Sequence, residues 1–235
     1  MFIRIGRFST ILNDAIIDNF VAPRCLEKIE ILYEDEYLLA INKPSGLLSL
    51  SGKNPLNKDS VHHRLAQQFP EIRLTHRLDL GTSGIMLLAK DKTTNANLTA
   101  QFQARTVIKR YVSILSGELL SNDGVIDLPI AKDDKLFPRL KICQQTGKPA
   151  QSQYSVIERF KKPNLTKVIF MPLTGRTHQL RLHSQALGHP ILGCDLYGTP
   201  ETLAMSKRLM LHALDISFEH PYTQQPLTLT SNCPF

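Results

Sequence analysis

The chain has 235 residues, with 28 Lys and Arg against 21 Asp and Glu, so its formal net charge is +7. This length is enough for one large domain or two small ones, and an apolar share of 42% is ordinary for a packed core. The basic balance favours a polyanionic partner such as nucleic acid. No stretch reaches the roughly 18 apolar residues of a membrane span, and the N-terminus lacks the apolar core of a signal peptide, so a membrane partner ranks well behind nucleic acid.

The periodicity divides the chain into a short N-terminal extension and one domain. Residues 1–28 show little periodicity and contain Pro23 near their end. So short a segment buries too little apolar surface to fold alone. We therefore expect an extension at residues 1–28 and a single domain at residues 29–235.

Helix and strand patterns alternate irregularly along this domain. Residues 120–150 are polar and rich in turn signals, which predicts loops around one short strand and a candidate substrate-facing surface. Because regular βαβ spacing is absent, we predict an α+β fold. The expected strands are residues 29–33, 37–41, 85–89, 107–115, 153–157, 166–171 and 209–218, and the expected helices are residues 61–69, 94–104 and 176–187.

Residue types that hold disulfides, metals or cofactors are present without the spacing that such sites require. Four cysteines stand at positions 25, 143, 194 and 233 without a CxxC pair, which is typical of reduced thiols in a cytosolic protein. His178 and His183 are five residues apart and do not share a helix face, so we expect no metal site. Glycine-rich phosphate loops are absent, so we expect no nucleotide cofactor.

A single acid, Asp79, stands in a compact polar run at residues 75–84 (THRLDLGTSG), just before an expected buried strand. A carboxylate beside Arg77 could serve as a nucleophile or a fixed anion. The alternative is an aspartate that only caps the turn through its own backbone. From spacing alone, the turn is the better interpretation.

Two further residues combine a functional and a structural interpretation. Arg176 opens an expected helix, where free amides and a guanidinium could bind an anion, although an exposed helix start looks the same. Tyr111 follows Lys109 and Arg110, an arrangement suited to stacking on a base, although a lone tyrosine is more often half-buried in a sheet.

Taken together, five segments resemble the RluA family of RNA pseudouridine synthases. They stand in the family's order and cover about residues 29–230. Residues 146–151 (TGKPAQ) and the short length are most similar to the dual-specificity branch, which acts on ribosomal and transfer RNA. The five segments are residues 42–47 (NKPSGL), 76–84 (HRLDLGTSG), 109–111 (KRY), 175–183 (GRTHQLRLH) and 211–213 (LHA).

The resemblance implies a role for each matching residue. Asp79 is the catalytic aspartate, and Tyr111 stacks on the target uracil. Arg176 ion-pairs with the aspartate. Arg77 helps to displace the target nucleotide from its stack, and Leu211 forms a wall of the pocket.

The resemblance also implies the fold and the partners. We expect a mixed, largely antiparallel sheet with flanking helices and a central cleft. The enzyme would need neither cofactor nor metal, and would act as a cytoplasmic monomer on structured RNA rather than on DNA or membrane.

The sequence departs from the family at two places. Relatives commonly carry an acid directly after Gly193, where this chain has Cys194 followed by Asp195, which leaves the role of Asp195 open. We also expect no separate small RNA-binding domain before residue 29, so that the catalytic domain itself selects the target. Two alternatives stay open: a non-catalytic RNA-binding or ribosome-assembly factor, and a nucleoside hydrolase, which would need a second carboxylate.

Overall fold

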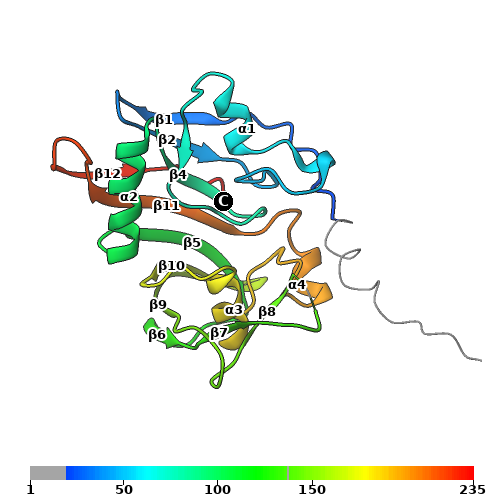
Figure 1. The fold of residues 1–235 in the computed structure, drawn as a ribbon. Coiled ribbons are helices and arrows are strands. Elements are labelled where there is room, and N and C mark those ends of the chain that lie inside the picture. Colours follow the sequence, from blue (N-terminus) through cyan, green and yellow to red (C-terminus); the bar gives the residue numbers. More distant parts are fainter. Residues whose placement is uncertain (1–19, 137) are drawn as a thin grey trace, which may run out of the picture.

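The computed structural model describes residues 20–136 and 138–235, and a single ten-stranded sheet dominates them (Figure 1). Its strand order is β1-β2-β4-β11-β5-β10-β9-β6, with β3 paired to β4 and β12 paired to β11. The strands of this sheet are β1 (Glu30–Glu34), β2 (Leu38–Lys43), β3 (Arg73–Leu74), β4 (Ser83–Ala89), β5 (Ile108–Ser116), β6 (Asp123–Asp127), β9 (Gln151–Lys161), β10 (Asn164–Pro172), β11 (Leu211–Glu219) and β12 (Pro226–Thr230).

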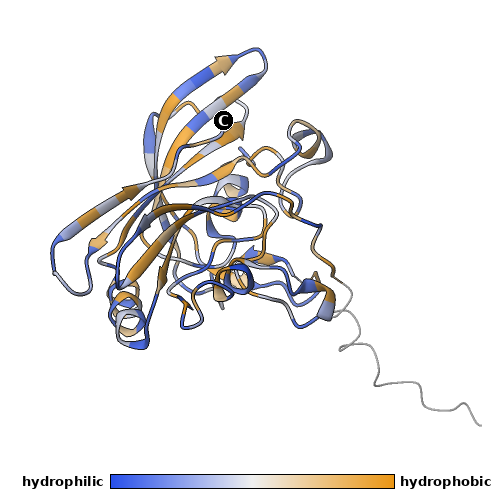
Figure 2. Ribbon diagram, turned by 90° about the horizontal axis from the view of Figure 1, so that it is seen from above, coloured by the Kyte–Doolittle hydropathy of each residue, from blue (hydrophilic) through white to orange (hydrophobic). Residues whose placement is uncertain are grey.

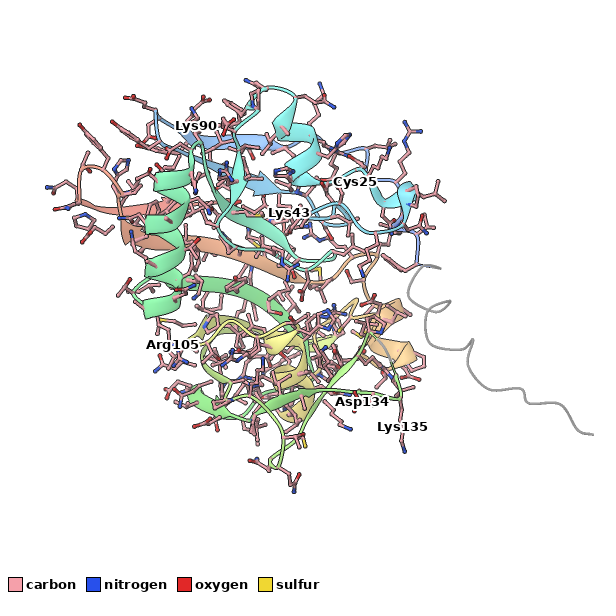
Figure 3. The ribbon with its side chains drawn as sticks, viewed as in Figure 1. Cys25, Lys43, Lys90, Arg105, Asp134 and Lys135 are labelled. Atoms are coloured by element: carbon pink, nitrogen blue, oxygen red, sulfur yellow. The ribbon has the colours of Figure 1, made fainter. Side chains whose placement is uncertain are left out.

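The remaining elements flank this sheet. The short hairpin β7–β8 forms a separate two-stranded sheet, and Asp134 and Lys135 in its connection lie at the lower edge of the molecule in Figure 3. In Figure 1, α1 lies beside the blue strands, α2 crosses the sheet near β4 and β11, and α3 lies in the lower half. These elements are β7 (Ile130–Lys132), β8 (Leu140–Ile142), η1 (Pro55–Asn57), α1 (Val61–Ala66), α2 (Lys92–Ala104), α3 (Gln179–Ala186) and α4 (Pro200–Ala204).

Strand pairing in the large sheet is antiparallel except between β4 and β11, which run parallel. The predicted α+β class, with a mixed and largely antiparallel sheet, is therefore confirmed. The hairpin expected around the acidic turn is also present, because β1 pairs with β2 and Asp35 Oδ1 accepts the backbone N–H groups of Tyr37 and Leu38 at 2.7 and 2.8 Å.

Two apolar cores lie along this sheet, and the central strands carry them (Figure 2). One core packs β2 and β4 against α1 and α2, with Leu39 and Leu87 fully buried. The other packs β5 and β10 against α3, with Leu115 and Phe170 fully buried. Tyr111 of β5 contacts both cores, so it lies where the two halves of the molecule meet.

The register of the central strands brings distant parts of the chain into one row. Ser83 at the start of β4 pairs with His212 near the start of β11, and His212 pairs with Val112 of β5. Val112 in turn pairs with Ile169 of β10. Since β4, β11 and β10 run in the same direction, the residues that precede β4 and those that follow β10 lie on opposite sides of this row. The segment before β4 runs back beside this strand, where Thr75 Oγ1 donates to Leu87 O at 2.8 Å and Leu87 N donates to His76 Nε2 at 3.0 Å.

Several element boundaries differ from the expectation. Residues 120–150 hold three strands (β6, β7 and β8) rather than one, because β6 pairs with the distant β9, and spacing along the chain does not record such a pairing. The helix expected at 61–69 ends at Ala66, shortly before Phe69, whose helical conformation the following Pro70 disfavours. The helix expected at 94–104 begins earlier, at Lys92, because Asp91 caps it.

The C-terminal elements differ as well. The helix expected at 176–187 is shorter and begins at Gln179, although Gly188 follows it with a φ of 82°, as predicted for its C′ position. The strand expected at 209–218 runs from Leu211 to Glu219, and both α4 and β12 come in addition to the expected elements.

The described end of the N-terminal extension is bonded to the domain. Asn57 donates to Phe20 O at 2.7 Å, and its Oδ1 accepts Ala22 N at 2.8 Å. Arg64 of α1 donates to Cys25 O and Glu27 O, each at 2.6 Å. Residues 20–29 have no regular secondary structure, and the rest of the expected extension lies outside the described residues.

Helices long and apolar enough to cross a bilayer are absent from the described part of the chain.

The close approach of β4 to β11 depends on the absence of a side chain at Gly84. A Cβ there would lie 2.2 Å from Ala213 O and 2.6 Å from Ala213 N, and the φ of 109° suits glycine alone. We expect Gly84→Ala to lower the free energy of unfolding by about 3 kcal/mol or more, measured by urea unfolding. Gly175→Ala is the control, because no atom lies within 4 Å of its added Cβ. Equal stability of the two variants would contradict this packing.

Candidate active site

A cleft of about 700 Å³ opens where the two halves of the sheet meet. The five residues singled out in the sequence all line it: Arg77, Asp79, Tyr111, Arg176 and Leu211. Among the described lining residues, Asp79 is the only acid, and it shares the cleft with five cations: Arg77, Arg105, Lys109, Arg176 and Arg181. The cleft therefore combines a single carboxylate with a strongly cationic wall, which suits a polyanionic substrate.

Hydrogen bonds on both sides of Asp79 fix its loop to residues 43–49. Turn formation begins within the loop itself, where Thr82 N donates to Asp79 O at 3.1 Å. The carboxylate of Asp79 forms no hydrogen bond or ion pair within the described residues, and it lines the cleft. The bonds between the two segments are Ser49 Oγ to Leu78 O at 2.7 Å, Leu78 N to Ser49 Oγ at 3.1 Å, Gly46 N to Leu80 O at 2.8 Å and Ser45 Oγ to Gly81 O at 2.7 Å.

A buried lysine supports the same two segments. Lys43 at the end of β2 is fully buried, and it lies inside the upper half of the molecule in Figure 3. Its Nζ donates to Pro44 O at 3.0 Å, Leu47 O at 2.7 Å and Leu80 O at 3.2 Å. Burial lowers the pKa of Lys43 to about 7, against the raising effect of Asp79. The lysine of the NKPSGL segment is thus a buried hydrogen-bond donor behind the Asp79 loop.

His212, which pairs with Ser83 next to the Asp79 loop, is held by hydrogen bonds as a neutral ring. His212 Nε2 lies 3.2 Å from Ser231 O, which can only accept, so Nε2 carries the proton. Ser83 Oγ then donates to Nδ1 at 2.8 Å, and Arg208 donates to the same hydroxyl. Burial lowers the pKa of His212 to about 4, consistent with a neutral ring.

Tyr111 forms part of the cleft wall and is half-buried. Burial and the neighbouring charge of Asp79 both raise the pKa of its hydroxyl. The phenol therefore keeps its proton at neutral pH, so it is not a resident phenolate base. Its ring remains available for stacking on a planar ligand.

The structure places the two arginines of the GRTHQLRLH segment differently from the expectation. Arg176 Nε donates to Pro149 O at 3.0 Å, and within the described residues no ion pair joins Arg176 to Asp79. Arg181 is only 4% exposed and donates to Cys194 Sγ at 3.3 Å and to Asp195. Desolvation would lower the pKa of Arg181, but Cys194, Asp195 and Asp79 raise it overall. Arg181 is thus a buried cation in the cleft wall, paired with Asp195, and the charge of Asp79 is the last of the three that raise its pKa.

The expected anion site at the start of this helix is also corrected. Gln179, the first residue of α3, uses its side chain to close the preceding turn. Its Oε1 accepts Arg176 N at 3.0 Å and Thr174 Oγ1 at 2.7 Å, while its Nε2 donates to Gln151 O at 2.9 Å. The Arg176 amide is therefore occupied within the chain.

Arg77, Leu211 and His183 lie in three different environments. Arg77 is exposed and forms no hydrogen bond or ion pair with the described residues, so its guanidinium can reorient. Leu211 is 3% exposed at the start of β11 and closes the cleft. His183 bonds to Ser152 and Leu128 in the core, and no group of three metal-ligating side chains occurs in the described part of the chain.

Sequence patterns missed Arg181 because the first six residues of α3 are buried on every side. Residues 179–184 are all buried, so the helix lacks the polar face that would show which arginine turns inward. The only signal was its place in the same segment as Arg176.

Comparison with known proteins identifies the site. The family described as RNA pseudouridylate synthase matches residues 37–186. The dual-specificity RNA pseudouridine synthase RluA of Vibrio vulnificus (strain CMCP6) is 44% identical over 209 residues, which cover 88% of this chain and 84% of the relative. The Escherichia coli (strain K12) protein of the same name is 42% identical over 205 residues, covering 87% and 93%. The chain belongs to the RluA family of RNA pseudouridine synthases.

Solved structures support the same fold for this synthase. Human RNA Pseudouridylate Synthase Domain Containing 1 superposes with a TM-score of 0.77 at 29% identity, covering 91% of this chain and 86% of the human one. Human RNA Pseudouridylate Synthase Domain Containing 4 gives a TM-score of 0.68 at 28% identity, with coverages of 87% and 88%.

The structure gives the departure at Cys194 and Asp195 a physical meaning in this synthase. Cys194 is buried and its sulfur accepts Arg181 Nε, while Asp195 pairs with the same guanidinium from the surface. Both residues that follow Gly193 thus contact Arg181, a residue of the cleft wall.

Lys43→Met tests whether an ionisable ammonium is buried behind the Asp79 loop. The pKa of Lys43 is about 7 when folded, against its ordinary value of 10.5. Between these values the unfolded chain binds a proton that the folded chain does not, so stability rises with pH. Because methionine does not titrate, the difference in unfolding free energy between wild type and variant should widen from pH 7 to about 10. Urea unfolding at several pH values measures it.

The control for this experiment is Lys58→Met, which removes a lysine from an exposed position. A difference between wild type and Lys43→Met that stays constant over the same pH range would contradict the depressed pKa.

Proposed function

We propose that this synthase isomerises uridines in structured ribosomal RNA, transfer RNA or both to pseudouridine, with Asp79 as the catalytic residue. The observation that carries the proposal is the state of Asp79. Its loop is fixed by hydrogen bonds on both sides, while its carboxylate is unpaired and is the only acid among the described residues of the cleft. A rigidly held, unpaired carboxylate suits a nucleophile or a group that stabilises a developing positive charge.

The reaction matches this inventory of residues. The N1–C1′ bond of uridine breaks, the uracil turns, and a C5–C1′ bond forms; the C5 proton is lost and N1 gains one. No electron leaves the nucleotide and no water is added, so one carboxylate can suffice. Asp79 would attack C1′ or C6, or assist the departure of the uracil.

The remaining lining residues support the same proposal. The ring of Tyr111 would stack on the target base. Because its hydroxyl keeps its own proton, a water molecule or Asp79 would remove the C5 proton. Arg77, exposed and unbonded within the described residues, would enter the space that the flipped nucleotide leaves. Leu211 would bound the uracil pocket.

The alternatives fit less well. A nucleoside hydrolase needs two carboxylates across the scissile bond, whereas Asp79 is the only acid among the described lining residues. A non-catalytic RNA-binding factor would not require a fixed and unpaired carboxylate. We further propose that the synthase works as a cytoplasmic monomer, with the domain at residues 29–235 carrying the whole site.

Asp79→Asn tests the catalytic assignment. Because asparagine keeps the size but lacks the charge and nucleophilicity, we expect pseudouridine formation on ribosomal and transfer RNA transcripts to fall by at least about 10³-fold. Carbodiimide mapping of the RNA measures the product.

Asp123→Asn is the matched control, because Asp123 is an exposed acid of β6 outside the cleft. Full activity of Asp79→Asn would rule out Asp79 as the catalyst, and free uracil among the wild-type products would favour hydrolysis.

Substitution of Arg181 should lower kcat, whereas the same substitution of Arg176 should not. Arg181→Lys keeps the charge but loses the forked contacts with Cys194 and Asp195, so we expect kcat to fall about 10²-fold. Arg176→Lys should leave kcat close to that of wild type, because Arg176 bonds to Pro149 O rather than to Asp79. Single-turnover and steady-state assays measure both, and the reverse ranking would restore the original assignment to Arg176.

A further inference from the structure

His178 lies between the active-site cleft and the buried hydroxyl of Tyr197. It immediately precedes α3 and adopts a left-handed conformation, with φ 55° and ψ 16°. A residue with a Cβ occupies this region at a cost of about 1 kcal/mol. His178 lines the cleft, whereas Tyr197 is 4% exposed and lines a second cavity of about 410 Å³ behind it.

The hydrogen bonds of Tyr197 define which nitrogen of His178 carries the proton. Tyr197 Oη accepts Leu140 N at 2.9 Å and lies 2.8 Å from His178 Nδ1. The hydroxyl has one hydrogen, and Nδ1 is the acceptor within reach. The arrangement that satisfies every donor therefore has Tyr197 donating to Nδ1, which leaves the proton of a neutral imidazole on Nε2.

The environment of His178 is consistent with a neutral ring. Desolvation lowers the pKa of His178, and the positive charge of Arg181 lowers it further, against the opposing effects of Asp79 and Asp195. Tyr197 is itself held firmly, because the guanidinium carbons of Arg181 and Arg139 lie 5.3 and 5.9 Å from its ring centre.

The other side of the imidazole is open. Nε2 has no hydrogen-bond partner in the described part of the chain. It is also not among the described unpaired polar atoms that are buried, so it is exposed. Its N–H is thus accessible from the cleft that Asp79 also lines.

We propose that His178 contacts the substrate by donating a hydrogen bond from Nε2 to a carbonyl oxygen of the target uracil, and that Tyr197 is the positioning residue that fixes this tautomer. The proposal rests on the proposed function. It names the uracil because the electron pair left on N1 when the N1–C1′ bond breaks spreads to the carbonyl oxygens, where a neutral donor stabilises it.

Two substitutions of nearly equal length separate the hydrogen bond from the backbone strain. His178→Gln and His178→Met both place a Cβ in the left-handed region, but only glutamine offers an N–H donor. We expect the single-turnover rate at saturating RNA to fall about 10²-fold in His178→Met and to recover largely in His178→Gln, with RNA affinity little changed in both. A wild-type rate in His178→Met would overturn the contact. A raised Kd for RNA with an unchanged rate would also overturn it, since it would place the donor on the RNA backbone.

Tyr197→Phe tests the positioning role with a readout independent of activity. Side-chain ¹⁵N chemical shifts of His178, assigned by the signals that vanish in His178→Gln, report which ring nitrogen is protonated. We expect Nε2 to be protonated and Nδ1 unprotonated in wild type, and a mixture of both tautomers in Tyr197→Phe. A proton on Nδ1 in wild type would overturn the positioning role.

Tyr33→Phe is the matched control, since it removes a hydroxyl that bonds to Asp35 on the β1–β2 hairpin. It should leave both the rate and the His178 signals unchanged. If wild type forms no pseudouridine on any RNA, the proposed function fails. A wild type that is active while His178→Met keeps its rate overturns only the present inference.

Discussion

The active site depends on the hydrogen bonds that join the Asp79 loop to residues 43–49. Serine hydroxyls, a glycine amide and the buried amine of Lys43 bind main-chain groups of Leu78, Leu80 and Gly81. Each such bond contributes only about 1 kcal/mol net, but together they surround a single residue on both sides. The loop can therefore hold an unpaired carboxylate in one place, and catalysis by positioning requires this, since a shift of about 1 Å can cost 10²-fold in rate.

The cations that line the cleft form two groups, those that a substrate would contact and the buried Arg181. Arg77, Arg105 and Lys109 line the cleft, and a polyanion would meet them there. Arg181 also lines the cleft but is buried, where its own partners are Cys194 and Asp195. Because opposite charges interact more strongly at low dielectric, this buried pair is the firmer of the contacts that position the guanidinium.

The sheet determines how these groups meet. Asp79, Tyr111 and Arg181 lie far apart in the chain, yet they line one cleft, because β4 pairs with β11, β11 with β5 and β5 with β10. The parallel contact between β4 and β11 is possible because Gly84 has no side chain. Tyr111, packed against both cores, links the two halves of the site.

The sequence by itself determined the α+β class, the β1–β2 hairpin and the glycine that ends α3, because apolar periodicity and turn chemistry act between near neighbours. Of the five residues that line the cleft, Arg77, Asp79, Tyr111 and Arg176 stood out by residue type, and Leu211 came from the family resemblance. Their catalytic roles remain predictions. Only the tertiary structure decided that Arg181 is buried in the cleft wall while Arg176 bonds to Pro149 O, that Lys43 lies beneath the loop, and that residues 120–150 form three strands. The physical reason is that the burial of residues 179–184 and the pairing of β6 with β9 arise from distant contacts, which leave no period in the chain.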